Sequence, residues 1–104
     1  MSHLKDLLDQ IGRETTRLIV DEISSQGLIK TGALRDSIDY EVVETSKGYE
    51  LDFSMIYYGE FLDKGTRYIQ PPREFYEKII QEQMTKYEDE IVEATIEDMM
   101  DEIE

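Results

Sequence analysis

The clearest structural signal lies in residues 38–55, which read IDYEVVETSKGYELDFSM. Apolar and acidic residues alternate on both sides of Thr45-Ser46-Lys47-Gly48, and a period of two is typical of strands with one face on a core. Gly48 can take the positive φ that a tight connection requires. The pattern therefore predicts an antiparallel hairpin over residues 38–57, with one apolar and one acidic face.

Two strands are only marginally stable alone, so the apolar face of this hairpin needs helices or further strands against it. On both sides of the hairpin, apolar residues recur at the three- and four-residue steps of an amphipathic helix. Upstream, we expect a helix over residues 3–26, which Ser2 caps and which Gly27 closes in a left-handed conformation. Downstream, Pro72 suits a first helical turn, and we expect an acidic helix over residues 73–102. The sequence thus predicts an α+β fold with a long C-terminal helix packed on a small sheet.

The apolar residues of the expected C-terminal helix form two stripes. The first stripe is Tyr76, Ile80, Met84, Tyr87 and Ile91, and the second is Val92, Ile96, Met99 and Ile103. A helix of about 30 residues spans about 45 Å, which is longer than a domain of this size is wide. We therefore expect the end of the helix to project and its apolar stripe to contact a partner. A partly disordered acidic tail is the alternative, because the charge density is high.

The composition fits one domain over residues 1–104 and limits the partners that it can have. With 25 acidic and 11 basic residues the net charge is -14, which disfavours nucleic acids and acidic membrane surfaces. Residues 74–104 hold twelve of the carboxylates and only two lysines. The absence of cysteine is compatible with a reducing cytoplasm, and no apolar window approaches the ~18 residues that a membrane span needs. We expect neither a targeting segment nor membrane association.

Residues 58–72, which follow the hairpin, show neither the period of a strand nor that of a helix. They begin with YGEFLDKGT at residues 58–66 and end in Pro71-Pro72, so we expect a shaped, irregular connection. A second such tract, TGALRDSI, precedes the hairpin at residues 31–38, and its Thr31 can cap a single helical turn. The aromatic side chains of this region are expected to close the core over the hairpin. These are Tyr58, Phe61 and Phe75.

The sequence offers little for catalysis. His3 is the only histidine and lies in a terminus that we expect to be mobile, so a Ser-His-Asp arrangement has no base. Glu60 and Asp63 would share a face of a helical turn, which suits metal binding or acid/base chemistry. An acidic turn that pairs with Lys64 or Arg67 is the other interpretation. The glycines form no phosphate-binding pattern, and we expect no catalytic residue, cofactor or metal.

Taken together, the two tracts resemble the signature of small neck proteins of long-tailed bacteriophages, which are head-tail connector or tail-completion proteins. Members typically show Thr-Gly-x-Leu-Arg-x-Ser-Ile, a hairpin, an aromatic-led run ending in Glu-aromatic-Gly-Thr, and a Pro-Phe start to the last helix. The matching residues are Thr31, Gly32, Leu34, Arg35, Ser37, Ile38, Tyr58, Gly65 and Thr66. Asp63 stands in the place of the glutamate, and Lys64 replaces the usual aromatic residue.

The resemblance implies a virion protein that forms a homo-oligomeric ring, a hexamer or dodecamer, at the head-tail junction and lets DNA pass. Its partners would be further copies and other neck, connector or tail-tube proteins, and it would be made in the host cytoplasm and located in the virion neck or tail. It implies no specific nucleic-acid binding, no membrane and no cofactor. The expected subunit-interface residues are Arg35, Tyr58, Asp63, Lys64, Gly65, Thr66 and Arg67. The acidic composition agrees physically, because an acidic ring would not grip phosphates.

Two other function classes remain open. An acidic DNA mimic would inhibit a nucleic-acid-binding protein, because -14 charges on a small domain resemble a phosphate array. A small hydrolase would use Glu60 and Asp63. The mimic predicts salt-sensitive binding to a basic partner, and the hydrolase predicts that amide replacements abolish an activity without changing the fold.

Overall fold

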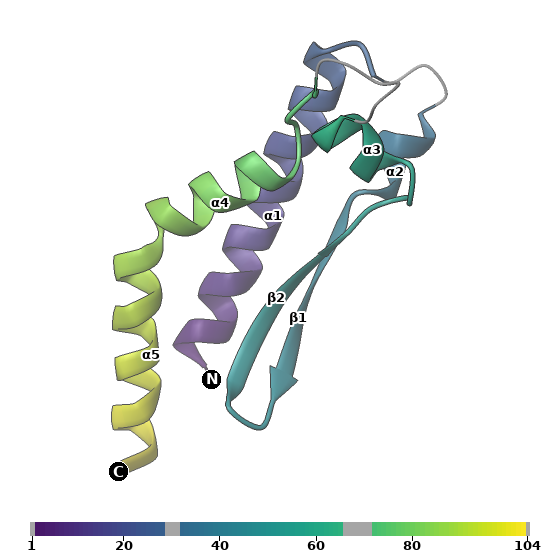
Figure 1. Ribbon diagram of the computed structural model, residues 1–104. Helices are drawn as coiled ribbons and strands as arrows, with labels where there is room; N and C mark the ends of the chain where they lie inside the picture. Colours follow the sequence, from purple (N-terminus) through teal and green to yellow (C-terminus); the bar gives the residue numbers. More distant parts are fainter. Residues whose placement is uncertain (1, 29–31, 66–71, 104) are drawn as a thin grey trace.

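The computed structural model describes residues 2–28, 32–65 and 72–103 (Figure 1). In chain order the elements are α1 (His3–Ser25), α2 (Ala33–Ser37), β1 (Asp39–Thr45), β2 (Gly48–Ser54), α3 (Gly59–Lys64), α4 (Glu77–Lys86) and α5 (Glu88–Ile103). The molecule is elongated and measures 56 × 23 × 21 Å along its principal axes. Helices, a two-stranded antiparallel sheet and a long C-terminal helical segment confirm the predicted α+β class.

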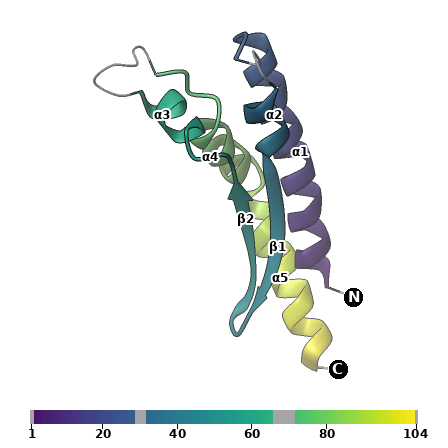
Figure 2. The ribbon, with the colours of Figure 1, turned by 90° about the vertical axis from the view of Figure 1, so that its right-hand side faces the viewer.

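Helix α1 is the central element of the molecule. The β1–β2 hairpin lies along one side of α1, and α4 and α5 lie along another side (Figures 1 and 2). The predicted caps of α1 are confirmed: Ser2 Oγ accepts a hydrogen bond from the N–H of Lys5 at 3.0 Å, and Gly27 has φ 72°. The N–H of Leu28 then donates to the carbonyl of Ile23, which closes the helix end.

The predicted hairpin is confirmed, both in its position in the sequence and in which of its faces is apolar. Tyr40 lies opposite Phe53 and Val42 lies opposite Leu51, so the apolar residues share one face. Two residues connect the strands, and Gly48 has the expected positive φ, 136°. The apolar face packs on α1, because Val42 and Leu51 join the same cluster as buried residues of that helix.

The core consists of two clusters that lie one after the other along α1. The cluster near the C-terminal end of α1 is formed by Ile19, Ile23, Leu34, Ile38 and Phe75. The cluster near its N-terminal end is formed by Leu8, Ile11 and Tyr87, against which Val42, Leu51, Met84 and Ile91 pack. Between the clusters Thr15 is fully buried, and its hydroxyl accepts a hydrogen bond from Gln83 Nε2 at 3.3 Å. A satisfied polar pair therefore joins α1 to α4 where the apolar pattern of α1 is interrupted.

The predicted single helix over residues 73–102 is wrong in two respects. It begins later, at Glu77, because Glu74 has φ 50° and Phe75 turns into the core, where it is fully buried. It is also divided at Tyr87, whose φ of -100° and ψ of 7° depart from helical values. The first apolar stripe, which runs through this division, packs on the clusters around α1, whereas the second stripe in α5 stays exposed.

The elements that pack on the hairpin, and the connection that follows it, also differ from expectation. Helix α1 packs directly on both strands, while α4 and α5 pack on α1 and add Met84 and Ile91 to the shared cluster. The connection predicted over residues 58–72 is not wholly irregular, because its first part forms α3.

None of the helices in the described part of the chain combines the length and the apolar character that a membrane span requires.

At Gly12 the hairpin approaches α1 closely. The ring of Tyr40 lies directly over its Cα, so a Cβ at this position would overlap several ring atoms. The Tyr40 hydroxyl also donates to Asp9 Oδ1 at 2.8 Å, which fixes the ring over the helix. The glycine that weakens the helix on propensity grounds is therefore required by packing.

We expect Gly12→Ala to destabilise the protein by about 1–3 kcal/mol, because overpacking at Tyr40 outweighs the better helix propensity of alanine. Urea unfolding followed by circular dichroism measures this change. The control is Gly12→Ala combined with Tyr40→Ala, compared with Tyr40→Ala alone. In that background the alanine should be neutral or stabilising, and an equal loss in both backgrounds would contradict the packing explanation.

Candidate functional site

The two tracts on either side of the hairpin meet at one end of the molecule, where α2 and α3 lie together (Figure 1). Ser37 Oγ donates to the carbonyl of Leu34 at 2.7 Å and accepts from the N–H of Ile56 at 3.0 Å. The Cδ1 of Leu34 lies against the Cα of Gly59, where a Cβ would come within 2.9 Å of it. We call residues 32–38 and 55–65 the α2–α3 end.

Asp63 is a structural residue of this end and not a surface contact. It is 4% exposed, and its carboxylate accepts hydrogen bonds from the N–H groups of Tyr76, at 2.9 Å, and Glu77, at 3.3 Å. These N–H groups lie at the start of α4, so Asp63 caps that helix from a distant segment. This burial and the two bonds to its oxygens argue against the expected contact of Asp63 with a neighbouring copy.

Lys64 remains on the surface, between two carboxylates. Its Nζ lies 3.3 Å from Glu60 Oε1 and 3.4 Å from Glu77 Oε2. Hydrogen bonds, first to Glu60 and then to Glu77, raise the pKa of Lys64 above its ordinary value. An exposed pair of this kind contributes little to stability, so Lys64 is free to exchange partners at low cost.

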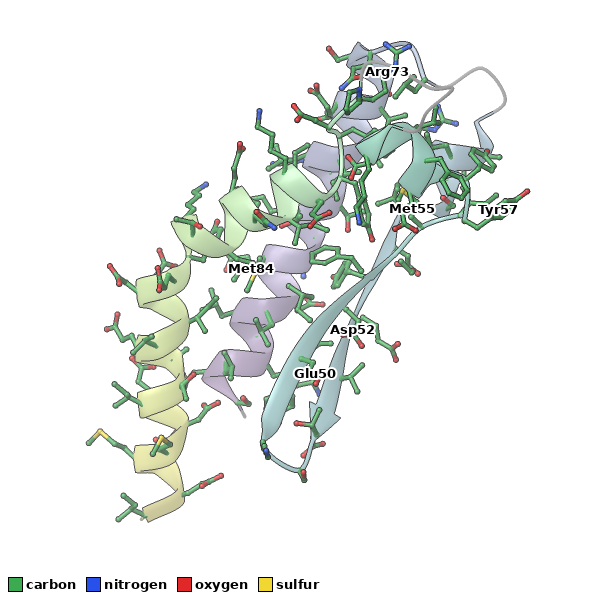
Figure 3. The ribbon with its side chains drawn as sticks, in the orientation of Figure 1. Glu50, Asp52, Met55, Tyr57, Arg73 and Met84 are labelled. Carbon is green, nitrogen blue, oxygen red and sulfur yellow. The ribbon has the colours of Figure 1, made fainter. Side chains whose placement is uncertain are left out.

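Aromatic side chains of this end divide between core and surface. Tyr58 packs on the buried cluster around Phe75, as predicted, and its ring meets that of Tyr57 edge to face at 5.7 Å. Tyr57 itself is 79% exposed and points away from the body of the molecule (Figure 3). The prediction that Phe61 closes the core is wrong, since this side chain is 49% exposed. Its place near Phe75 in the core is taken by Leu62.

Next to these residues, the surface holds a hollow of about 360 Å³. One side of it is apolar and includes Met55, Ile56 and Ile80. Glu60, Glu77 and Lys64 line another side. An apolar wall beside two carboxylates suits a long side chain with a positive or polar end.

The remaining residues predicted for the subunit interface have different positions. Arg35 lies on α2, is partly exposed and pairs with Asp36 at 3.1 Å. Gly65 ends α3 with φ 75° and ψ 165°, a conformation that favours glycine. Thr66 and Arg67 lie outside the described residues. The structure thus brings Arg35, Tyr58 and Lys64 to the α2–α3 end, and only Tyr58 among them is mainly a core contact.

The outer face of the hairpin carries a separate group of carboxylates. Glu41 lies directly opposite Asp52, and Asp39 and Glu50 extend the row on the same face. Like charges directly opposite one another destabilise a strand pair. Figure 3 shows Glu50 and Asp52 on β2, and both are exposed. In the described part of the chain no other element pairs with the free edge of either strand.

A third polar group joins the N-terminus of α1 to α5. Asp98 accepts hydrogen bonds from the Ser2 hydroxyl at 2.6 Å and from the N–H groups of His3, at 2.6 Å, and Leu4, at 3.2 Å. The Ser2 hydroxyl, and then these N–H groups, hold the pKa of Asp98 below its ordinary value, although burial opposes them. The His3 ring lies 3.3 Å from Glu97 and 3.1 Å from Asp101. His3 is therefore held against α5, which corrects the expectation of a mobile terminus.

The arrangement of His3, Asp98 and Asp101 also has the dimensions of a metal site, since one ligand atom from each lies within 4.8 Å of the others. Asp98 is nonetheless already occupied by three donors from the start of α1. The position of the Asp98 carboxylate is therefore explained by its bonds to the start of α1. The arrangement of His3, Asp98 and Asp101 needs no metal to account for its geometry.

We expect Asp98→Asn to lower the melting temperature at neutral pH. The folded state depresses the pKa of this carboxyl, so its contribution is present above the unfolded value of about 3.9 and is lost as the pH falls through the folded pKa. The gap between wild type and Asp98→Asn should close in that acidic range. Asp101→Asn is the control, because within the described residues the polar contact of Asp101 is with the His3 side chain. A gap that does not change with pH would contradict the assignment.

Sequence reasoning missed the roles of three of these residues. Nothing in the local pattern distinguishes Asp98 from its acidic neighbours, and its position 95 residues from His3 gives no local signal. The capping role of Asp63 likewise depends on a contact with residues 13 and 14 positions away. Tyr57 could have been noticed, because it follows the alternating run of β2 and has no apolar residue opposite it in the hairpin.

Comparison with known proteins adds no relative. No protein-family model matches this sequence, and no curated protein or solved structure matches it at a significant level.

Proposed function

We propose that this chain is a structural protein of the neck of a long-tailed bacteriophage, and that copies of it form a ring at the head-tail junction through which DNA passes. One observation carries the proposal. The two tracts that resemble the neck-protein signature flank the hairpin, whose antiparallel pairing brings them together, and Leu34 of the first lies against Gly59 of the second. One end of the molecule therefore carries both tracts.

The chemistry of the α2–α3 end supports an assembly role over a catalytic one. Asp63 is buried and bound to two backbone N–H groups, and Glu60 pairs with Lys64. Neither carboxylate is arranged as a general acid or base beside the other. The hydrolase alternative therefore gains nothing from the geometry.

The exposed side chains of the same end provide a surface for a neighbouring copy. Tyr57 and Phe61 offer apolar area, and aromatic residues are enriched where proteins meet. Arg35 and Lys64 pair with exposed carboxylates of the same chain, and they can exchange these partners for those of a neighbour at low cost. The acidic outer face of a neighbouring hairpin, around Glu41 and Asp52, is the complementary surface that the chain itself contains.

This arrangement predicts a specific variant effect. Replacing Arg35 and Lys64 together with alanine should raise the concentration needed for assembly roughly tenfold or more, because two charge pairs with the neighbour are lost. The control, Lys5→Ala with Lys47→Ala, removes the same two charges at exposed positions far from this end. Native mass spectrometry over a concentration series measures both variants, and circular dichroism verifies that the monomers remain folded.

The wild-type result tests the function and the variants test the surface. A ring that forms in wild type and control but not in the Arg35/Lys64 variant supports both. A wild-type protein that is monomeric at every concentration contradicts the ring, and equal losses in variant and control contradict the choice of surface.

The acidic DNA mimic remains the second candidate, and the carboxylate row on the hairpin favours it. Asp39, Glu41, Glu50 and Asp52 form an exposed row of negative charge. A mimic would bind a basic nucleic-acid-binding protein as a monomer, with an affinity that falls steeply with salt. Such binding without self-assembly would favour the mimic over the ring.

A further inference from the structure

Helix α5 has two apolar sides, and only one of them has a partner within the described residues. Ile91 packs on the buried cluster around Tyr87, and Ala94 is buried. Val92, Ile96, Met99 and Ile103 follow at steps of four, three and four residues, which places them on one face. Between 50% and 84% of each of these four side chains is exposed. We call this face the α5 stripe.

The α5 stripe is not explained by the fold. Single exposed apolar residues are ordinary, but a continuous row along three turns of helix is typical of a binding surface. Valine and isoleucine are also weaker helix formers than the lysine, glutamate or alanine that a solvated face could carry. Val92, Ile96 and Ile103 therefore lower helix propensity without adding to the core.

The charges around the α5 stripe decide which occupant it can accept. Between Glu88 and Ile103 the helix has eight carboxylates and neither lysine nor arginine. At 100° per residue, Asp89 and Glu93 lie along one flank of the stripe, and Glu88 and Glu102 lie along the other. A second copy of α5 would place its own carboxylates against these, and like-charge contacts across an interface are strongly unfavourable. Nucleic acids and anionic membranes are opposed for the same reason.

We propose that the α5 stripe docks a basic amphipathic helix of a different protein. The apolar face of such a helix would cover the stripe, and lysine or arginine on its flanks would pair with the carboxylates beside it. From Val92 to Ile103 the stripe extends about 16 Å, so the docked segment needs about three to four helical turns. This contact uses a different surface from the ring contact at the α2–α3 end and does not depend on it.

The experiment uses the full chain and a labelled synthetic peptide of about 14 residues, built from leucine and lysine so that the leucines share one helical face. Fluorescence anisotropy should give a dissociation constant in the micromolar range at about 50 mM salt, and weaker binding at about 300 mM. The control peptide has the same composition in an order that places the leucines on no common helical face. It should bind at least roughly tenfold more weakly.

Two pairs of protein variants locate the site. Ile96→Ser with Met99→Ser should weaken binding roughly tenfold or more, whereas Tyr57→Ser with Phe61→Ser removes exposed apolar area elsewhere and should change it less than about twofold. Asp89→Asn with Glu93→Gln should weaken binding, whereas Glu41→Gln with Asp52→Asn removes the same charge from the hairpin and should change it little. All eight positions are exposed, and circular dichroism verifies that each variant keeps its helix content.

Three results would overturn the proposal. Equal binding of the two peptides, or of both charge variants, would mean attraction by net charge alone. The absence of binding would remove the site. A wild-type dimer that Ile96→Ser with Met99→Ser abolishes would assign the α5 stripe to a second copy of this chain.

Discussion

The packing of α1 on both sides is the constraint on which the rest of the structure depends. The hairpin has only two strands and cannot stand alone, and α4 and α5 have few contacts with it except through α1. Both core clusters include side chains of α1, and between them the buried Thr15–Gln83 hydrogen bond joins α1 to α4. Gly12 allows Tyr40 to approach α1 closely, and Asp98 ties the start of the helix to α5. A change that separates α1 from either neighbour therefore exposes part of a core in a domain that has little apolar burial to spare.

This arrangement also separates the surfaces that the chain can offer to partners. The α2–α3 end lies at one end of the elongated molecule, where Ser37, Leu34 and Gly59 hold the two signature tracts together. The α5 stripe lies toward the other end of the molecule, on the helix that follows the bend at Tyr87 (Figure 1). Because these surfaces share no residues, self-assembly through one and partner binding through the other can occur in the same molecule.

The parts of the fold that follow from local pattern were predictable from sequence, and the parts that depend on distant contacts were not. Alternation over residues 38–55 gave the hairpin and its facing, and Ser2 and Gly27 gave the ends of α1. The bend at Tyr87 was missed because tyrosine carries no breaking signal and the first apolar stripe, from Tyr76 to Ile91, continues through it. The late start of α4 was missed because Pro72 and Glu74 suit a first turn, while the burial of Phe75 overrides them. Of the predicted site residues, Lys64 and Arg35 lie on the surface, whereas Asp63 serves as a helix cap that only the folded chain reveals.

The central role of α1 is tested most directly by native-state hydrogen exchange of the full chain. The amides of Ile11, Ile19 and Ile23 lie in the helix on which both clusters depend. They should exchange only through global unfolding, with an opening free energy equal to the free energy of unfolding from urea denaturation. The hairpin amides should open at the same free energy or a lower one. Local opening of α1 while the hairpin amides stay protected would contradict this account, because it would mean that the hairpin is stable without the helix that covers it.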